Sequence, residues 1–151
     1  NRIADFFLEV LFDRLTQAFG RLVVYQPKAV PGARVLRGAA GEESFGRFRL
    51  TWRREPAPRR IARSGWTTWL AADDLGLRAF ADGDQLRPLG GAGRRKVSRL
   101  LMEAKVGRGE RAAYPVVVAA GDVAWVPGVC RGAVALPAAG SESVRVDVTV
   151  R

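Results

Sequence analysis

Residues 82–131 read DGDQLRPLGGAGRRKVSRLLMEAKVGRGERAAYPVVVAAGDVAWVPGVCR. In the middle of this stretch apolar side chains recur at i, i+3, i+4 and i+7, which is the spacing of one face of a helix. This spacing predicts a helix over residues 94–105 whose narrow buried stripe consists of Val97, Leu100, Leu101 and Ala104. On the opposite face we expect Arg95 and Arg99 side by side, and Arg99 can also pair with Glu103 one turn away.

Strand patterns follow this helix. Residues 115–120 and 123–126 are rich in valine, and Gly121-Asp122 between them predicts a hairpin. Residues 144–150 alternate valine with charged residues and threonine. Because successive side chains of a strand point to opposite faces, this alternation predicts a closing strand with one buried face.

The segments before the helix are less regular. Residues 48–53 alternate apolar residues with arginine or threonine and predict a strand with Phe48, Leu50 and Trp52 on one face. Residues 31–44 are rich in glycine and alanine, and we expect a loop there. Residues 55–65 are rich in proline and arginine and are expected to form an exposed connection, which either contacts RNA or is simply solvated.

The positive charge is concentrated in two segments. The chain carries a formal net charge of +10, and almost all of the excess lies in residues 47–63 and 78–111. Neutralising phosphates with such segments releases condensed counterions, so a nucleic acid is a favoured partner. A GC-rich genome would account for arginine in place of lysine, but not for the confinement of the surplus to two segments.

Several classes of protein are excluded by composition. Cys130 is the only cysteine and there is no histidine, which excludes disulfide frameworks, Cys/His zinc sites and histidine-based catalysis. A reduced, cytoplasmic location fits. Residues 1–20 have helical spacing and are interrupted by charges, so we expect the remnant of a preceding helical domain and no membrane span. We interpret the chain as part of a longer protein.

Two features each have two interpretations. Asp73-Asp74 is typical of a turn or cap, although paired carboxylates also perform acid–base chemistry or hold magnesium. The glycine loop at residues 90–93 lacks the spacing of a nucleotide-binding loop. It is either a structural turn or a cradle for an RNA phosphate, and the basic residues that follow favour the phosphate.

The order of motifs in residues 82–131 resembles the C-terminal domain of bacterial tRNA(Ile)-lysidine synthetases. That family has a Gly-Asp turn, an Arg-Pro-Leu-Gly segment, a glycine loop, a basic helix, a basic loop, a Pro-led strand and a Trp-Val-x-Gly close. The matching residues here are Gly83-Asp84, Arg87-Pro88-Leu89-Gly90, Gly91-Ala92-Gly93, residues 94–105, Lys105-Val106, Arg108, Glu110-Arg111, Pro115 and Trp125-Val126-Pro127-Gly128. Gly107 replaces a frequent proline and Gln85 a frequent basic residue.

The resemblance implies a function. These enzymes activate the wobble cytidine of the isoleucine tRNA with a CAU anticodon, using ATP and magnesium, and join lysine to it. The Ser-Gly-Gly-x-Asp-Ser loop that this requires is absent from the sequence. We therefore expect no catalytic residue, cofactor or metal in this chain, only tRNA binding on the acceptor-stem side, with the catalytic domain of the parent enzyme as a partner. Two alternatives stay open: a general structured-RNA-binding or protein-interaction module, and a free-standing enzyme with an active site of carboxylates, lysine and arginine. The oligomeric state, including a homodimer, is left open.

The resemblance also implies an α+β fold, with a small, mostly antiparallel sheet and one or two packed helices, like a domain of the phenylalanyl-tRNA synthetase β-subunit. Residues 21–65 would be a β-rich connecting region with basic loops, and residues 66–151 the tRNA-binding domain. The expected core residues are Val97, Leu100, Leu101, Val116, Val118 and Trp125. The expected RNA-binding residues are Arg87, Arg94, Arg95, Lys96, Arg99, Lys105, Arg108, Arg111 and Arg131.

Overall fold

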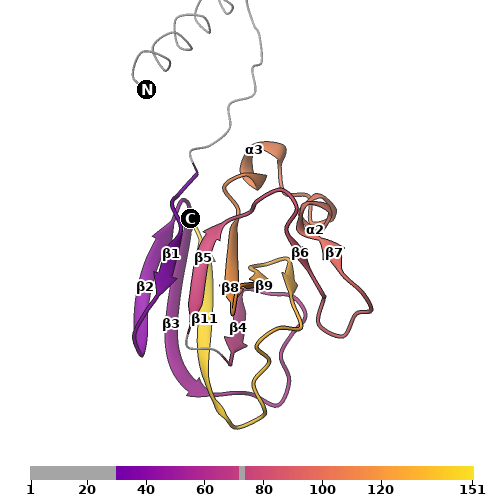
Figure 1. Cartoon of the computed structure of the whole chain (residues 1–151). Coiled ribbons are helices and arrows are strands. Elements are labelled where there is room, and N and C mark those ends of the chain that lie inside the picture. The colour runs from indigo at the N-terminus through magenta and orange to yellow at the C-terminus, as the bar shows by residue number, and fades with distance from the viewer. Residues whose placement is uncertain (1–29, 72–73) are drawn as a thin grey trace, which may run out of the picture.

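The computed structural model describes residues 30–71 and 74–151, in which two antiparallel sheets carry a small hairpin and two short helices (Figure 1). The larger sheet runs in the order β1 (Arg34–Leu36), β5 (Leu75–Ala79), β8 (Pro115–Ala119), β9 (Asp122–Val126) and β10 (Cys130–Arg131). The second sheet runs in the order β2 (Ala40–Phe45), β3 (Phe48–Pro56), β11 (Glu142–Val150) and β4 (Thr67–Leu70). The hairpin pairs β6 (Gln85–Leu86) with β7 (Arg95–Lys96), and the helices are α2 (Val97–Glu103) and α3 (Arg108–Arg111).

The alternating strands form the centre of the second sheet. β11 pairs with β3 from Glu142 opposite Pro56 to Val150 opposite Phe48. The apolar residues from Phe48 to Trp52 and from Val144 to Val148 lie on the same side and are buried, as Leu50 and Val146 illustrate with no exposed surface, whereas Val150 at the end of β11 is exposed. The strands predicted at residues 48–53 and 144–150 are therefore confirmed, because their period of two leaves one face for the core.

The prediction of a loop over residues 31–44 is wrong, because this segment contains β1 and most of β2. Its glycine content has a packing reason. Gly41 lies opposite Trp52, and a Cβ atom on Gly41 would lie 2.1 Å from the Trp52 ring. Glycine here makes room for an aromatic ring within a strand instead of marking a turn.

The predicted helix at residues 94–105 is shorter than expected. Only Val97–Glu103 is helical, because Arg95 and Lys96 pair with the strand Gln85–Leu86 in the hairpin. The following segment, predicted as a loop over residues 106–111, contains the single turn α3. The hairpin of β8 and β9 is confirmed, with its turn between Ala119 and Asp122.

The predicted core is largely confirmed. Val97, Leu101, Val116 and Trp125 are almost completely buried and Leu100 is 7% exposed, whereas Val118 is only partly buried at the edge of the cluster. The antiparallel architecture is confirmed as well. The α+β assignment needs a correction, because the two helices are minor and the fold is largely β, with two sheets in place of one.

The proposed division of the chain also changes. β1 pairs with β5, and β3 pairs with β11. The strands β1 and β3 are therefore paired with strands that follow residue 66. A domain boundary at residue 66 would divide both sheets. The helix expected at residues 1–20 lies outside the described residues. Asp73 does too, while Asp74 is exposed just before β5.

Arg131 connects the two sheets from the inside. Its guanidinium donates to Thr68 Oγ1 (2.9 Å) and to the carbonyl oxygen of Trp69 (2.9 Å), both in β4, and to that of Ala124 (3.2 Å) in β9. It also donates to the carbonyls of Gly132, Val134 and Ala135. Arg131 has no exposed surface, so its predicted contact with RNA is wrong: its donors are committed to the fold. Burial lowers the pKa of Arg131 to about 10, so the side chain is still charged at neutral pH.

We expect Arg131→Met to lower the free energy of unfolding by about 3 kcal/mol or more, because it leaves several buried carbonyl groups without a donor. Urea denaturation followed by tryptophan fluorescence measures this change. Arg145→Met is a suitable control, because Arg145 is partly exposed and its ion pair with Asp147 contributes at most about 1 kcal/mol. Equal losses in the two variants would contradict the role assigned to Arg131.

Candidate nucleic-acid interface

Exposed cations are concentrated on the β6–β7 hairpin and on α2. Arg87 and Arg94 lie in the loop of the hairpin, Lys96 ends β7, and Arg99 lies on α2. All four are exposed, and within residues 30–71 and 74–151 the structure gives none of them an ion pair. Their positive charges are therefore available to an external anion.

The loop that carries two of these arginines is fixed at its base. Pro88 forms a β-bridge with Gly132, and the N–H of Leu89 donates to the carbonyl of Arg131 at 2.9 Å. Gly90 and Gly93 have φ angles of 73° and 82°, values that favour glycine. These angles support the turn interpretation of the glycine loop, and phosphate binding by the loop stays a prediction.

Asp84 joins the hairpin to the larger sheet and to the start of α2. Its carboxylate accepts two hydrogen bonds from Arg78 of β5, at 2.8 and 2.9 Å, and one from the N–H of Ala81. Its carbonyl accepts from the N–H of Val97, the first residue of α2. Burial raises the pKa of the Asp84 carboxyl, but the hydrogen bonds from Arg78 and Ala81 outweigh this and lower the pKa below its ordinary value.

Two of the predicted contact residues have partners within the protein. Arg95 of β7 forms the ion pair with Glu103, whereas Arg99, the partner that the helical spacing suggested, contributes only through its charge, which helps to lower the pKa of Glu103. Arg111 donates to the carbonyl of Val106 at 3.1 Å and thereby holds the loop that leads into α3. Arg108, at the start of α3, is exposed and has a further interaction within the protein.

Lys105 has an unusual backbone conformation, with a φ of 60°. The N–H groups of Lys105 and Val106 donate to the carbonyls of Met102 and Leu101, both at 3.0 Å, which is the Schellman arrangement that ends a helix. Glycine usually occupies this position, since a side chain there costs about 1 kcal/mol. A lysine at this position therefore costs stability, which is typical of functional positions.

The two basic segments meet at Arg63, which sequence analysis did not single out. A Cβ atom on Gly91 would lie 3.5 Å from a terminal nitrogen of Arg63. The N–H of Arg131 donates to the carbonyl of Arg63 at 2.7 Å. Burial raises the pKa of the Cys130 thiol, and the Arg63 guanidinium, hydrogen-bonded to it, opposes that rise. The signals in the sequence were the charge excess of residues 47–63 and the arginine-rich connection predicted at residues 55–65.

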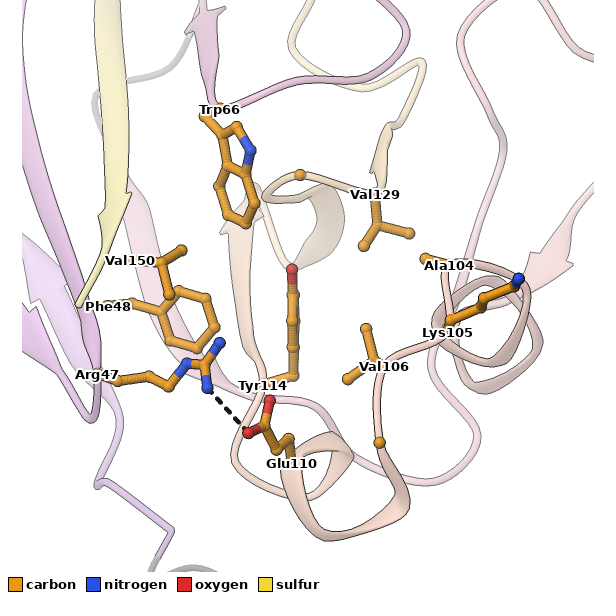
Figure 2. A pocket seen from close by; sticks show the side chains of 12 residues that line it. Arg47, Phe48, Trp66, Ala104, Lys105, Val106, Glu110, Tyr114, Val129 and Val150 are labelled. Atoms are coloured by element: carbon orange, nitrogen blue, oxygen red, sulfur yellow. Dashed lines mark hydrogen bonds and ion pairs between the residues drawn. The ribbon is translucent and has the colours of Figure 1, made fainter.

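A cleft of about 390 Å³ opens next to Lys105. Figure 2 shows Trp66, Val129, Val106, Phe48 and Tyr114 around it. The Phe48 and Tyr114 rings meet edge to face, with centroids 5.1 Å apart. The Tyr114 hydroxyl donates to the carbonyl of Pro127 at 2.6 Å, and burial raises the pKa of Tyr114 to about 12.

Other kinds of site find no support in the part of the chain that the structure describes. No group of three or more Cys, Asp or Glu side chains there is placed to hold a metal ion. No helix among the described residues is long and apolar enough to cross a membrane. The expectation that ATP and magnesium bind elsewhere in the parent enzyme stays a prediction.

The comparisons with known proteins all find similarity to tRNA(Ile)-lysidine synthases or to a domain of these enzymes. Residues 75–148 match the family model described as TilS substrate C-terminal domain. The chain is 34% identical, over 152 aligned residues, to a tRNA(Ile)-lysidine synthase of Symbiobacterium thermophilum, covering 91% of the chain and 31% of that protein. A tRNA(Ile)-lysidine synthase of Shouchella clausii is 44% identical over 54 residues, covering 35% of the chain and 12% of that protein. The chain thus spans less than a third of the length of either relative.

The fold is also that of a solved structure, described as the crystal structure of a TILS C-terminal domain. The TM-score is 0.68, and the match covers 79% of this chain and 98% of that one. At 19% identity this likeness concerns the fold alone. It extends well beyond residues 75–148 and so agrees with the inclusion of β1 to β3 in the same architecture.

We expect Lys105→Gly to raise the free energy of unfolding by about 0.5 kcal/mol or more, because glycine relieves the positive φ. Ala104→Gly is the matched control. Ala104 has a φ of −77°, so glycine there adds only chain entropy to the unfolded state and lowers stability by up to about 1 kcal/mol. Urea denaturation of both variants tests this, and a loss of stability in Lys105→Gly would contradict the strain argument.

A pH dependence follows from Tyr114. Its pKa is raised to about 12 in the folded protein, while an unfolded tyrosine ionises near pH 10. The stability that this group contributes is fully present below pH 10 and is lost as the pH rises toward 12, by about 2 kcal/mol. The lowered pKa of Arg131 acts in the opposite direction over the same interval, so we expect the free energy of unfolding of the unchanged chain to fall relative to that of Tyr114→Phe, in which the tyrosine contribution is absent. An unchanged slope in Tyr114→Phe would contradict this assignment.

Proposed function

Because the chain carries a TilS substrate C-terminal domain at residues 75–148, we propose that it is the tRNA-binding part of a tRNA(Ile)-lysidine synthase. The parent enzyme would join lysine to the wobble cytidine of the isoleucine tRNA with a CAU anticodon, at the expense of ATP. Its catalytic domain would lie outside this chain, in the same cytoplasmic protein. This chain contributes binding energy and tRNA selection, not catalytic groups.

The exposed cations of the hairpin and α2 are the observation that carries this proposal. Arg94 at the end of the hairpin loop, Lys96 in β7 and Arg99 in α2 follow one another along the chain, without ion pairs among the described residues. The grooves of an A-form stem offer few base edges to side chains, so proteins bind such stems mainly through phosphates and sugars. A row of cations on fixed backbone suits a stem of this kind. We assign it to the acceptor-stem side of the tRNA because the resemblance to the C-terminal domains of tRNA(Ile)-lysidine synthetases implies that side.

The residues of the proposed contact fall into two groups. Those that would bind phosphates directly are Arg87, Arg94, Lys96, Arg99 and Lys105. Arg63 and Arg108, which also have interactions within the protein, would add positive charge to the same surface. Arg95 and Arg111 would serve mainly to hold α2 and the loop before α3, because their guanidinium groups already have protein partners. Contacts so far from the anticodon would allow the enzyme to distinguish the isoleucine tRNA from a methionine tRNA with the same anticodon.

A salt series of tRNA binding tests the proposal. We expect the triple variant Arg94→Ala, Lys96→Ala and Arg99→Ala to bind the isoleucine tRNA about tenfold or more weakly. We also expect its plot of log affinity against log salt concentration to be shallower by about 2, because each lost phosphate contact removes somewhat less than one released counterion. Fluorescence anisotropy with labelled tRNA at several salt concentrations measures both quantities.

The double variant Arg49→Ala and Arg53→Ala is the matched control. Both arginines lie on the outer face of β3 and are paired with Glu42 and Glu55. We expect this variant to bind tRNA nearly as the unchanged chain does. A loss of affinity in the double variant of about two thirds of the free-energy loss in the triple variant, in proportion to the two and three charges removed, would mean that net charge alone governs binding. Equal affinity for unrelated structured RNAs would favour a general RNA-binding module over a tRNA-specific one.

A further inference from the structure

The cleft beside Lys105 is built from distant parts of the chain. Phe48 and Val150 come from the paired ends of β3 and β11, and Val106 comes from the loop after α2. Trp66 precedes β4, and Figure 2 shows its ring pointing into the space between Val150 and Val129. Although most of these residues are apolar, Trp66 and Val150 keep 43% and 38% of their surface exposed.

The position of Trp66 depends on a glycine. Gly128 has a φ of 74°, and a Cβ atom on it would lie 2.4 Å from the Trp66 ring. The Trp66 carbonyl accepts from the N–H of Val148, and the N–H of Gly128 donates to the carbonyl of Gly65. The indole is thus held flat against the backbone of one wall while much of its surface faces solvent. Exposed tryptophan that is held in place in this way is typical of a binding surface.

Cations flank the cleft. Arg47 lies over the Phe48 ring, with its central carbon 5.8 Å from the centroid, and pairs with Glu110 at 2.9 Å. Lys105 lies at the rim, where its positive φ sets its backbone, and Figure 2 shows its exposed ammonium group on the outer side of the turn, directed away from the cleft. Glu110 offsets one of the two charges, so the rim keeps a net positive charge. The rim is also continuous with α2, which carries Arg99.

We propose that this cleft binds an unpaired nucleotide of the RNA, with its base stacked on Trp66 and its phosphate near Lys105. This inference rests on the proposed function, since it places one base beside the surface that would hold a stem. A volume of about 390 Å³ lies near the lower end of the range of about 300–1,000 Å³ that ligand sites occupy. It is large enough for a single base.

The chemistry of the walls predicts how selective the site is. Stacking on aromatic rings is available to every base, whereas discrimination requires polar groups at the base edge. The Tyr114 hydroxyl is already committed to Pro127, and most other lining side chains are apolar. The site should therefore hold any unpaired base, and a purine more tightly than a pyrimidine because a purine offers more surface for stacking.

RNA hairpins with one common stem test the inference. One hairpin ends blunt, and the others carry a short single-stranded adenosine or uridine tail at the 3′ or the 5′ end. We expect a tail at one end to raise affinity about tenfold, since stacking of one base contributes about 1–3 kcal/mol. We expect Trp66→Ala to abolish this gain without changing affinity or salt slope for the blunt stem, and Trp66→Phe to keep most of it.

Each outcome has a separate meaning. If the unchanged chain does not bind the blunt hairpin at all, the proposed function itself is contradicted. Blunt-stem binding with no gain from any tail would overturn only the nucleotide site, and so would an equal weakening of both RNAs by Trp66→Ala. Trp69→Ala, on the outer face of the second sheet, is the control and should leave the gain from the tail intact. Quenching of tryptophan fluorescence by the tail, absent in Trp66→Phe, reports stacking directly and does not depend on the alanine variant folding.

Discussion

The structure depends on the buried guanidinium of Arg131. A charge enclosed among neutral groups is costly unless each of its donors has an acceptor. Here carbonyl oxygens from β4, from β9 and from the loop after β10 surround it. These acceptors belong to both sheets, so the sheets cannot separate without leaving the charge or the carbonyls unpaired. The backbone of Arg131 also accepts from Leu89, which connects this interior contact to the base of the basic hairpin.

The candidate interface inherits its rigidity from that arrangement. The hairpin rests on Gly132, Asp84 ties it to β5 and α2, and Arg95 of β7 pairs with Glu103 at the end of α2. Cations mounted on such a frame lose less conformational entropy on binding than cations on a flexible tail would. Lys105 and Trp66 are placed at a cost, one through a strained backbone and the other through incomplete burial. Both costs are intelligible if these side chains serve a ligand and not the fold.

Much of the fold could be predicted where the spacing of apolar residues in the sequence matches the buried face of a strand or helix. The strands at Phe48 and Val146, the β8–β9 hairpin and most of the core follow from alternation and turn chemistry. The errors arose where distant residues decided the outcome. Gly41 suggested a loop because its partner, the Trp52 ring, is invisible in a local pattern. Arg95 and Lys96 fit a helix equally well until their pairing with Gln85 and Leu86 is known.

By itself, the sequence determined the kind of molecule: a basic, largely antiparallel domain whose ordered motifs resemble those of one family and whose charge favours RNA. Composition, the spacing of apolar residues and the order of motifs can be read from the sequence without knowledge of tertiary contacts. Only the tertiary structure decided which arginines face solvent. Arg131 and Arg99 are the same type of residue, and both lie in the segment of residues 82–131. Arg131 is nevertheless buried between the two sheets, whereas Arg99 is exposed. Burial depends on residues far away along the chain, as does the cleft that places Trp66 beside Lys105.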